Sequence, residues 1–330
     1  MTQVNITAES SPNKKRKRDI WITKRLAVEA TCYKHNRKGI IRKSHWSLFE
    51  CLIGICGIFL RIIGLYRRGV KNAQNVIINE VIAEYPDLPE SLHDYKIMHL
   101  TDLHLDFAPS FENIIAEKIK GMVYDLCVIT GDYRKKTHNG YHQIIKPMER
   151  IIHAIKAKDG IFVTLGNHDT CEMVEQLEEM GVTLLANETI TLQKQKDTLV
   201  ITGIDDPHYY FTPQVISTLN EPNEGFKIIL VHTPEIYDMA ADKGYRLYLC
   251  GHTHGGQICL PGGVPIITHL NFGKEYYRGL WRYNEMLGYT NSGCGSVGIP
   301  VRFNSPGEIA IIRLKKTGYH RSRTVKKLPR

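Results

Sequence analysis

Short apolar runs rich in Ile, Val, Leu and Tyr alternate with amphipathic stretches from about residue 95 onward. Runs of this length and composition predict β-strands. There are seven: YKIMHLTDLHL, DLCVITGD, GIFVTLGNHD, TLVITGIDD, KIILVHTP, RLYLCGHTH and EIAIIRL. SFENIIAEKIKGM and YHQIIKPMERIIHAIKAK repeat apolar residues every three or four positions and predict helices, and Pro147 either kinks the second helix or marks its start. Alternating strands and helices indicate an α/β domain.

A longer apolar segment, SLFECLIGICGIFLRIIGLY, precedes this domain. As a helix, residues 48–65 would be about 27 Å long, close to the lower limit for crossing a bilayer. Glycine and charged residues recur along the segment at steps of three and four, so they share one helical face. This pattern fits a helix lying in the membrane interface, or a spanning helix that packs on a partner. A buried helix of a soluble protein is the third alternative.

Positive charge is concentrated near the two ends of the chain. Residues 1–46 carry 12 Lys and Arg against three acidic residues, and residues 311–330 carry eight basic residues and no acidic one. The part between has 23 basic and 31 acidic residues, so no groove for nucleic acid is expected there. We predict four parts: a basic, flexible arm (1–46), a hydrophobic membrane-associating helix (47–70), a folded domain (71–315) and a basic tail (316–330).

The basic arm also bears on topology. If residues 48–65 cross a bilayer, the excess of Lys and Arg before them would keep the N-terminus in the cytoplasm and place the domain on the other side. The run KKRKR would alternatively serve as a nuclear address or a nucleic-acid patch. We expect a membrane-associated protein, with the side of the domain and the oligomeric state left open.

Asp, Asn and His residues follow five of the predicted strands, at the points where the strands end. The motifs TDLH, TGD, GNHD, VHTP and GHTH supply Asp102, His104, Asp132, Asn167, His168, Asp169, His232, His252 and His254. Residues two apart in an extended chain point the same way, so D-x-H and H-x-H can each reach one ion. Each motif alone is more often a chance pair, a turn or a helix cap. Five of them at strand ends predict a metal site, because ligands gather there in α/β sheets.

The ligand chemistry indicates two ions. Carboxylate, imidazole and amide groups without thiolate suit Mn, Fe or Zn. Leaving out His168 and Asp169, seven candidate ligands remain, which are enough for two ions that share a carboxylate. Two ions roughly 3.5–4 Å apart clamp a phosphorus centre for in-line attack by water. We expect His168 to protonate the leaving oxygen, with Asp169 orienting it. A structural turn residue is the alternative for His168.

The ordered set D-x-H, G-D, G-N-H-D, H and G-H-x-H resembles calcineurin-like metallophosphoesterases. NSGCGSVGIPVRFNSPGEIAIIRL and YYRGLW are further similar to a bacterial branch of membrane-associated phosphodiesterases, which includes one type of UDP-2,3-diacylglucosamine pyrophosphatase of lipid A synthesis. The resemblance covers roughly residues 90–314. It implies two packed β-sheets flanked by helices in a four-layer sandwich, with the metals at one edge.

The resemblance also implies a ligand assignment. Asp102, His104 and His254 would hold the first ion. Asn167, His232 and His252 would hold the second, with Asp132 between the two ions and His168 not a ligand. The family often has a second acid shortly after G-D, where GDYRK has Arg134 and Lys135. We expect metal binding to survive this departure, while the groups around the ligands differ.

The expected function is a dinuclear-metal phosphohydrolase, with Mn as the first candidate metal and Fe or Zn as alternatives. The expected substrate is a lipid-linked phosphodiester or pyrophosphate such as UDP-2,3-diacylglucosamine, presented at a bacterial inner membrane. Arg278 and Arg302 would bind its phosphate or carboxylate groups, or else be structural salt-bridge residues. A general phosphodiesterase or phosphatase of the cell envelope, acting on small-molecule esters, is the second candidate. A non-catalytic metal-binding scaffold is the remote alternative.

Overall fold

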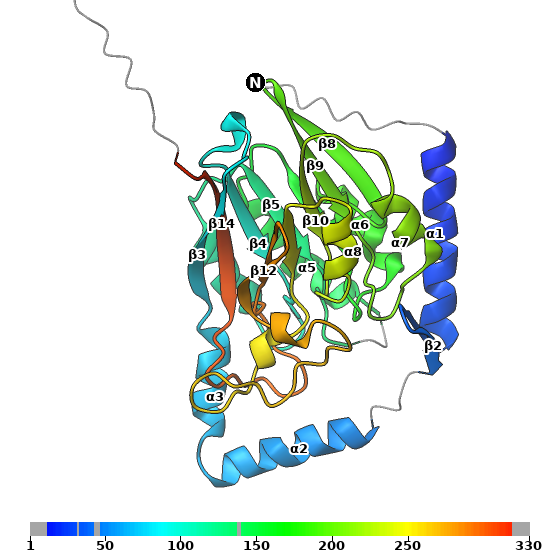
Figure 1. Cartoon of the computed structure of the whole chain (residues 1–330). Helices are drawn as coiled ribbons and strands as arrows, with labels where there is room; N and C mark the ends of the chain where they lie inside the picture. The colour runs from blue at the N-terminus through cyan, green and yellow to red at the C-terminus, as the bar shows by residue number, and fades with distance from the viewer. Residues whose placement is uncertain (1–11, 32, 43–46, 137–139, 319–330) are drawn as a thin grey trace, which may run out of the picture.

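Two mixed β-sheets of six strands each lie face to face at the centre of the molecule (Figure 1). The computed structural model describes residues 12–31, 33–42, 47–136 and 140–318. The first sheet has the order β3 (Ile77–Tyr85), β14 (Glu308–Lys316), β4 (Lys96–Leu100), β5 (Leu126–Thr130), β6 (Ile161–Thr164) and β7 (Thr183–Leu184). The second has the order β12 (Gly279–Tyr283), β13 (Met286–Thr290), β11 (Leu247–Cys250), β10 (Phe226–Leu230), β9 (Asp197–Gly203) and β8 (Glu188–Lys194).

Helices cover the outer faces of both sheets. They are α4 (Phe111–Ile119), α5 (Ile145–Ala154) and α6 (Val174–Glu179) on the first sheet, and α7 (Pro213–Leu219) and α8 (Tyr237–Asp242) on the second. Short 3₁₀ turns are η1 (Glu90–Leu92), η2 (His142–Ile144), η3 (Cys171–Met173), η4 (His254–Gly256) and η5 (Lys274–Tyr276). The expected α/β fold, with two mixed sheets flanked by helices, is confirmed, and Pro147 marks the start of α5 rather than a kink.

The central strands are largely apolar because they are buried on both faces. Ile97, Leu126 and Val128 of the first sheet pack against the second sheet in one core cluster. Met98 and Cys127, which point the other way, pack against α4 and α5. Alternate residues of a strand face opposite sides, so a strand with two buried faces has no polar face. This is why the seven apolar runs predicted strands correctly.

The apolar segment at 48–65 forms two helices rather than one. Helix α2 (Ser47–Ile62) ends in a turn at Gly64, and α3 (Tyr66–Gln74) follows it. Gly64 has a φ of 75°, its N–H donates to Arg61 O, and Leu65 N–H donates to Leu60 O. These two bonds form a Schellman C-cap, for which glycine is the favoured residue. Among the helices of the described residues, none is long and apolar enough to cross a membrane, so the expectation of one long apolar helix is wrong.

The described part of the basic arm is ordered. Residues Pro12–Thr31 form helix α1, which runs along the flank of the domain (Figure 1). A hairpin of β1 (Tyr33–Asn36) and β2 (Gly39–Arg42) follows it. Trp21, Arg25 and Val28 on α1 are buried, so this helix differs from the flexible segment that its charge predicted. Most of the predicted basic tail lies outside the described residues.

Candidate dinuclear metal centre

All seven candidate ligands lie in loops that directly follow strands. Strands β4, β5 and β6 run parallel to one another, as do β10 and β11, so their carboxyl ends meet at one edge of the sandwich. The loops after these strands carry, in chain order, Asp102 and His104, Asp132, Asn167, His232, and His252 and His254. Apart from the side chains at its rim, the cluster is almost fully buried.

The structure brings these side chains together as two overlapping groups. Asp102, His104 and His254 form one group, and Asp102, Asp132 and His232 form the other, with the possible ligand atoms of each group within 4.8 Å of one another. Asp102 Oδ1 lies 3.3 Å from His254 Nε2, and Asp132 Oδ2 lies 3.3 Å from His232 Nε2. His104 Nε2 lies between the groups, 3.7 Å from Asp132 Oδ2 and 3.9 Å from Asp102 Oδ1.

Asn167 and His252 form a third part of the same cluster. His252 Nδ1 lies 2.9 Å from Asn167 Oδ1, while its Nε2 lies 3.5 Å from the carbonyl oxygen of His269. A proton on Nε2 would leave a lone pair on Nδ1, facing the amide oxygen. Two ligand atoms of one ion are separated by about 3 Å when each bond is roughly 2.1 Å long and the bonds are at right angles. The pair therefore fits the second ion.

The backbone at the ligands is in an unusual conformation. Five of the seven have a positive φ, between 40° and 72°: Asp102, His104, Asp132, His252 and His254. Residues other than glycine rarely adopt this left-handed region, and such residues gather at functional sites. Asp102 and His104 therefore converge through a left-handed loop, so the predicted extended conformation at D-x-H is wrong.

Hydrogen bonds to backbone carbonyls fix how two of the histidines present their nitrogens. His104 Nδ1 lies 2.9 Å from Arg134 O, and His232 Nδ1 lies 2.7 Å from Thr130 O. A proton on each Nδ1 leaves the Nε2 lone pair pointing into the cluster, which is the usual arrangement of metal-binding histidines. His232 Nε2 and Asp102 Oδ1 are buried, and their contacts at 3.3 Å with Asp132 and His254 are not well-formed hydrogen bonds. Buried polar atoms without such a bond fit ligands of a divalent cation.

The charges of the cluster also favour a cation. Burial lowers the pKa of His104 to about 4 and that of His254 well below its ordinary value, so both rings are neutral and able to donate lone pairs. Burial also opposes a charge on His232, but Asp132 and Asp102 outweigh it and raise its pKa to about 10. In the absence of metal, a proton on His232 therefore balances part of the carboxylate charge, and an ion would take its place.

Two glycines leave room for the carboxylates. A methyl group at Gly166 would collide with Asp132 Oδ1, and one at Gly251 would collide with Asp102 Oδ2 and the Thr101 hydroxyl. His252 N–H also donates to Asp102 Oδ2 over 2.9 Å, which fixes that oxygen. The glycines of G-N-H-D and G-H-x-H are thus needed for the close approach of the two metal-site loops.

His168 lies at the rim of the cluster, and its side chain is 11% exposed. Its Nδ1 lies 2.5 Å from Lys135 O, and its Nε2 lies 4.0 Å from Asp132 Oδ2. The expectation that Asp169 orients this ring is wrong. The Asp169 carboxylate instead accepts backbone N–H groups of Gly166 (2.8 Å), Asp132 (2.7 Å) and Tyr133 (2.9 Å), so it joins two metal-site loops.

The basic residues near the site have structural contacts. Arg134 Nε donates to His168 O over 2.7 Å, and Lys135 Nζ donates to Gly298 O over 2.6 Å, where the family often has an acid. Arg302 is fully buried, and its guanidinium donates to backbone carbonyls, among them Ser292 O at 2.8 Å. This favours a structural role for Arg302, through backbone carbonyls rather than the expected salt bridge. Arg278 is partly exposed, with one long bond to Asn304 O.

A sixth loop, which the strand-end motifs did not predict, lies at the site. His208 follows β9, its ring centroid is 4.8 Å from that of His252, and its Nδ1 lies 3.1 Å from Glu235 Oε2. Asp206, in the same loop, is fully buried, and its carboxylate accepts the N–H of His208. The signal was available, because GIDDPH lies at a strand end like the other five motifs.

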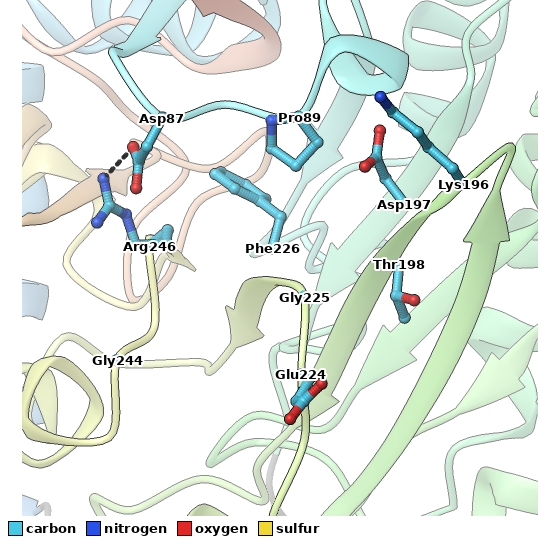
Figure 2. A pocket seen from close by; sticks show the side chains of 10 residues that line it. All are labelled: Asp87, Pro89, Lys196, Asp197, Thr198, Glu224, Gly225, Phe226, Gly244 and Arg246. Atoms are coloured by element: carbon cyan, nitrogen blue, oxygen red, sulfur yellow. Dashed lines mark hydrogen bonds and ion pairs between the residues drawn. The ribbon is translucent and has the colours of Figure 1, made fainter.

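A surface depression of about 450 Å³ lies at the opposite end of the sandwich. Figure 2 shows Thr198, Phe226 and Arg246 on its wall, with Arg246 paired to Asp87 at 2.6 Å. These residues stand at or before the starts of β9, β10 and β11, whereas the candidate ligands follow the ends of strands. The depression is therefore separate from the candidate metal centre.

Comparison with known proteins identifies the family. The model of the calcineurin-like phosphoesterases matches residues 95–256. The uncharacterised metallophosphoesterase YkuE of Bacillus subtilis is 31% identical over 240 residues, which are 70% of this chain and 82% of that protein. This chain belongs to the calcineurin-like metallophosphoesterases. A metallophosphoesterase of Helicobacter pylori (strain 26695) is 28% identical, over 78% of this chain and 69% of its own. The phosphodiesterase YaeI of Escherichia coli is 27% identical, over 67% and 82%.

As a calcineurin-like metallophosphoesterase, the protein is a metal-dependent hydrolase of phosphoric esters, not a non-catalytic scaffold. The family uses divalent metals, and the two overlapping groups provide candidate residues for two ions. The names of these relatives support the family but not the narrower resemblance to the UDP-2,3-diacylglucosamine pyrophosphatases.

Proposed function

We propose that this metallophosphoesterase hydrolyses a phosphodiester or pyrophosphate bond in a membrane-presented substrate, with UDP-2,3-diacylglucosamine as the specific candidate. The proposed ligands of its two ions are Asp102, His104, Asp132, Asn167, His232, His252 and His254. Mn is the first candidate metal, with Fe or Zn as alternatives. Two bound ions would supply Lewis acidity toward the phosphoryl oxygens and a nucleophilic water.

His168 is the proposed general acid. With one proton of the ring held by Lys135 O, the imidazolium form carries its second proton on Nε2, on the side of Asp132. Transfer of that proton to the leaving oxygen returns the ring to neutral without breaking the bond to Lys135. Arg134 holds the backbone carbonyl of His168 and so supports this orientation. The rim position leaves the ring accessible to substrate.

The proposal of a membrane-presented substrate rests mainly on the apolar outer face of α2. Leu52, Ile55, Phe59 and Ile62 are 56%, 56%, 57% and 78% exposed. Their spacing of three and four places them on one side of the helix. The exposed basic residues of this segment, Arg61, Arg67 and Arg68, complement anionic lipid headgroups. A helix lying in the interface needs no spanning length.

A second apolar surface lies in the loop that follows the metal-site motif GHTH. Leu260, Val264 and Ile266 of this loop are exposed. The loop begins beside the segment that supports α2, since Cys259 N–H donates to Phe303 O over 2.9 Å. Ile53 of α2 would touch a methyl group placed on Gly298 in that segment.

These contacts connect the apolar helix to the candidate general acid. Gly298 O accepts Lys135 Nζ, and Lys135 O in turn holds the His168 ring. A substrate anchored by acyl chains beside α2 would therefore have its headgroup near the rim of the metal centre. The proposed location is accordingly the surface of a bacterial inner membrane.

The proposal is tested with the purified full chain, Mn²⁺ and UDP-2,3-diacylglucosamine in anionic vesicles. We expect a lipid monophosphate and UMP as products. Exchange of Phe59 and Ile62 for Ser removes two groups whose burial would contribute about 3 kcal/mol, so vesicle binding should weaken about 100-fold. Turnover of soluble bis-p-nitrophenyl phosphate should stay unchanged in this variant. Val123→Ser, on another exposed apolar residue, is the matched control.

A second candidate function is a general phosphodiesterase of the cell envelope, which the name of the E. coli relative favours. Its signature in the same assays is good turnover of soluble diesters, no turnover of the diacyl sugar nucleotide, and no effect of the α2 substitutions. That result would overturn the lipid-linked substrate and leave the metal chemistry intact.

A further inference from the structure

Helix α1 is packed into the protein through one face. Trp21, Arg25 and Val28, at steps of four and three, are each no more than 4% exposed. Trp21 Nε1 donates to Asp205 Oδ2 over 2.6 Å, and Arg18 pairs with Glu178 of α6 at 2.8 Å. This helix lies outside the segment matched by the family model. Its buried face packs directly against the domain that contains that segment.

Arg25 reaches from α1 to the loop that carries Asn167 and His168. Its Nη2 donates to Gly166 O over 2.8 Å and to Asp169 O over 2.9 Å, at either end of that loop. Its Nη1 donates to the Asp205 carboxylate. Only a planar, forked donor meets acceptors in these separate directions at once.

The same side chain is itself held in place. Arg25 Nε donates to Glu29 Oε1 over 3.0 Å, and the guanidinium stacks 3.8 Å from the centre of the Tyr210 ring. Glu29 also accepts the hydroxyl of Thr170, the residue after the G-N-H-D motif, over 2.7 Å. Arg25 thus joins the loop after β6 to the loop after β9, which contains Asp205 and Tyr210.

The loop held by Arg25 also supports the proposed bridging ligand. Asp169, whose carbonyl Arg25 binds, accepts the N–H of Asp132 through its carboxylate, and the N–H of His168 donates to Asp132 Oδ1 over 2.9 Å. A shift of this loop would move Asn167 away from His252 and change the surroundings of Asp132. Residues that orient metal ligands typically alter metal affinity or activity 10- to 100-fold when they are removed.

We propose that α1 is a working part of the metal centre and that Arg25 is a positioning residue, which sets the place of the Asn167–His168 loop and thereby the affinity for the ion at Asn167 and His252. The proposal rests on the ligand assignment made above. It predicts that the affinity for this ion depends on Arg25, which is far in sequence from every proposed ligand.

The test measures Mn²⁺ binding to the metal-free full chain by calorimetry and by electron paramagnetic resonance, with Arg25→Lys as the main variant. Lysine keeps the positive charge beside Asp205, so the fold is retained, but it does not reach both loop carbonyls. We expect one of the two Mn²⁺ sites to weaken at least tenfold and the spin-coupled signal of the ion pair to fall, while the other site, which shares only Asp132 with it, weakens less. Arg25→Ala should show a larger loss, partly restored by added methylguanidinium.

Arg18→Ala is the matched control, because it removes a docking contact of α1 that touches no metal-site loop. It should bind both ions like the wild type. A folded Arg25→Lys variant with wild-type affinity at both sites overturns the role of Arg25, as does an equal loss in Arg18→Ala. A wild-type chain that binds fewer than two Mn²⁺ ions would instead overturn the proposed dinuclear site, so the two failures are distinguishable.

Discussion

Removal of the His168 side chain tests the proposed general acid directly. The His168→Ala variant keeps its backbone N–H, which donates to Asp132 Oδ1 over 2.9 Å, so the surroundings of the proposed bridging ligand are preserved. The ring is at the rim, and water can replace it at Lys135 O, so the loss of stability should be small. General acid catalysis contributes about 10²- to 10⁴-fold, or about 2.7–5.4 kcal/mol of transition-state stabilisation.

A comparison of two substrates with different leaving groups distinguishes loss of acid catalysis from other effects of the substitution. An alkyl leaving group needs a proton, so we expect kcat to fall by about 10²- to 10⁴-fold with an alkyl phosphodiester. Nitrophenolate leaves without one, so bis-p-nitrophenyl phosphate should lose less than tenfold. Bound Mn²⁺ should remain at two per chain, and His153→Ala, on an exposed residue of α5, should match the wild type. An equal loss with both substrates, or a fall in bound metal, would refute the assignment.

Three further predictions concern the ligands. Asp132→Asn keeps the shape but not the charge of the residue, so metal content by mass spectrometry and hydrolysis should both be lost; a variant with two tightly bound ions would remove the bridging role. Gly251→Ala should weaken Mn²⁺ binding about 10- to 100-fold because its methyl group displaces Asp102, whereas Gly54→Ala, with open space around it, should not. Because the pKa of His232 is raised to about 10 without metal, its ring is protonated at pH 7.5, and metal binding should release about one proton. Calorimetry in buffers of different ionisation enthalpy measures this release. A result of no release would contradict the prediction.

The sequence predicted the strands that form continuous apolar runs and missed those that do not. β8 alternates buried and half-exposed residues, and its sequence ETITLQK is largely polar. β12 and β13 form a hairpin whose turn contains Asn284 in a left-handed conformation, which no apolar run marks. Strands of this kind depend on their partner for burial, and a single-strand pattern does not show the partner.

The candidate site was more predictable than the backbone that builds it. The identities of Asp102, His104 and the other ligands followed from residue types at strand ends. Their left-handed conformations and the close approach of separate loops at Gly166 and Gly251 did not, because both depend on contacts between loops that are distant in the sequence. In α1, the surplus of Lys and Arg masked a narrow buried face, and the loop carbonyls that Arg25 binds lie at least 141 residues away in the chain.

Two elements outside the matched family segment adjoin the metal centre from different sides. On one side, α1 holds the Asn167–His168 loop through Arg25. On the other, α2 rests on the Gly298 segment, whose carbonyl holds Lys135, the residue that orients the His168 ring. Both connections end at the G-N-H-D loop, where a proposed metal ligand and the proposed acid are neighbours. A displacement of less than 1 Å in this loop would therefore affect metal affinity and proton transfer together, because catalytic groups tolerate little misplacement. The N-terminal segment thus supports the metal-site loops, and the apolar face of α2 is exposed.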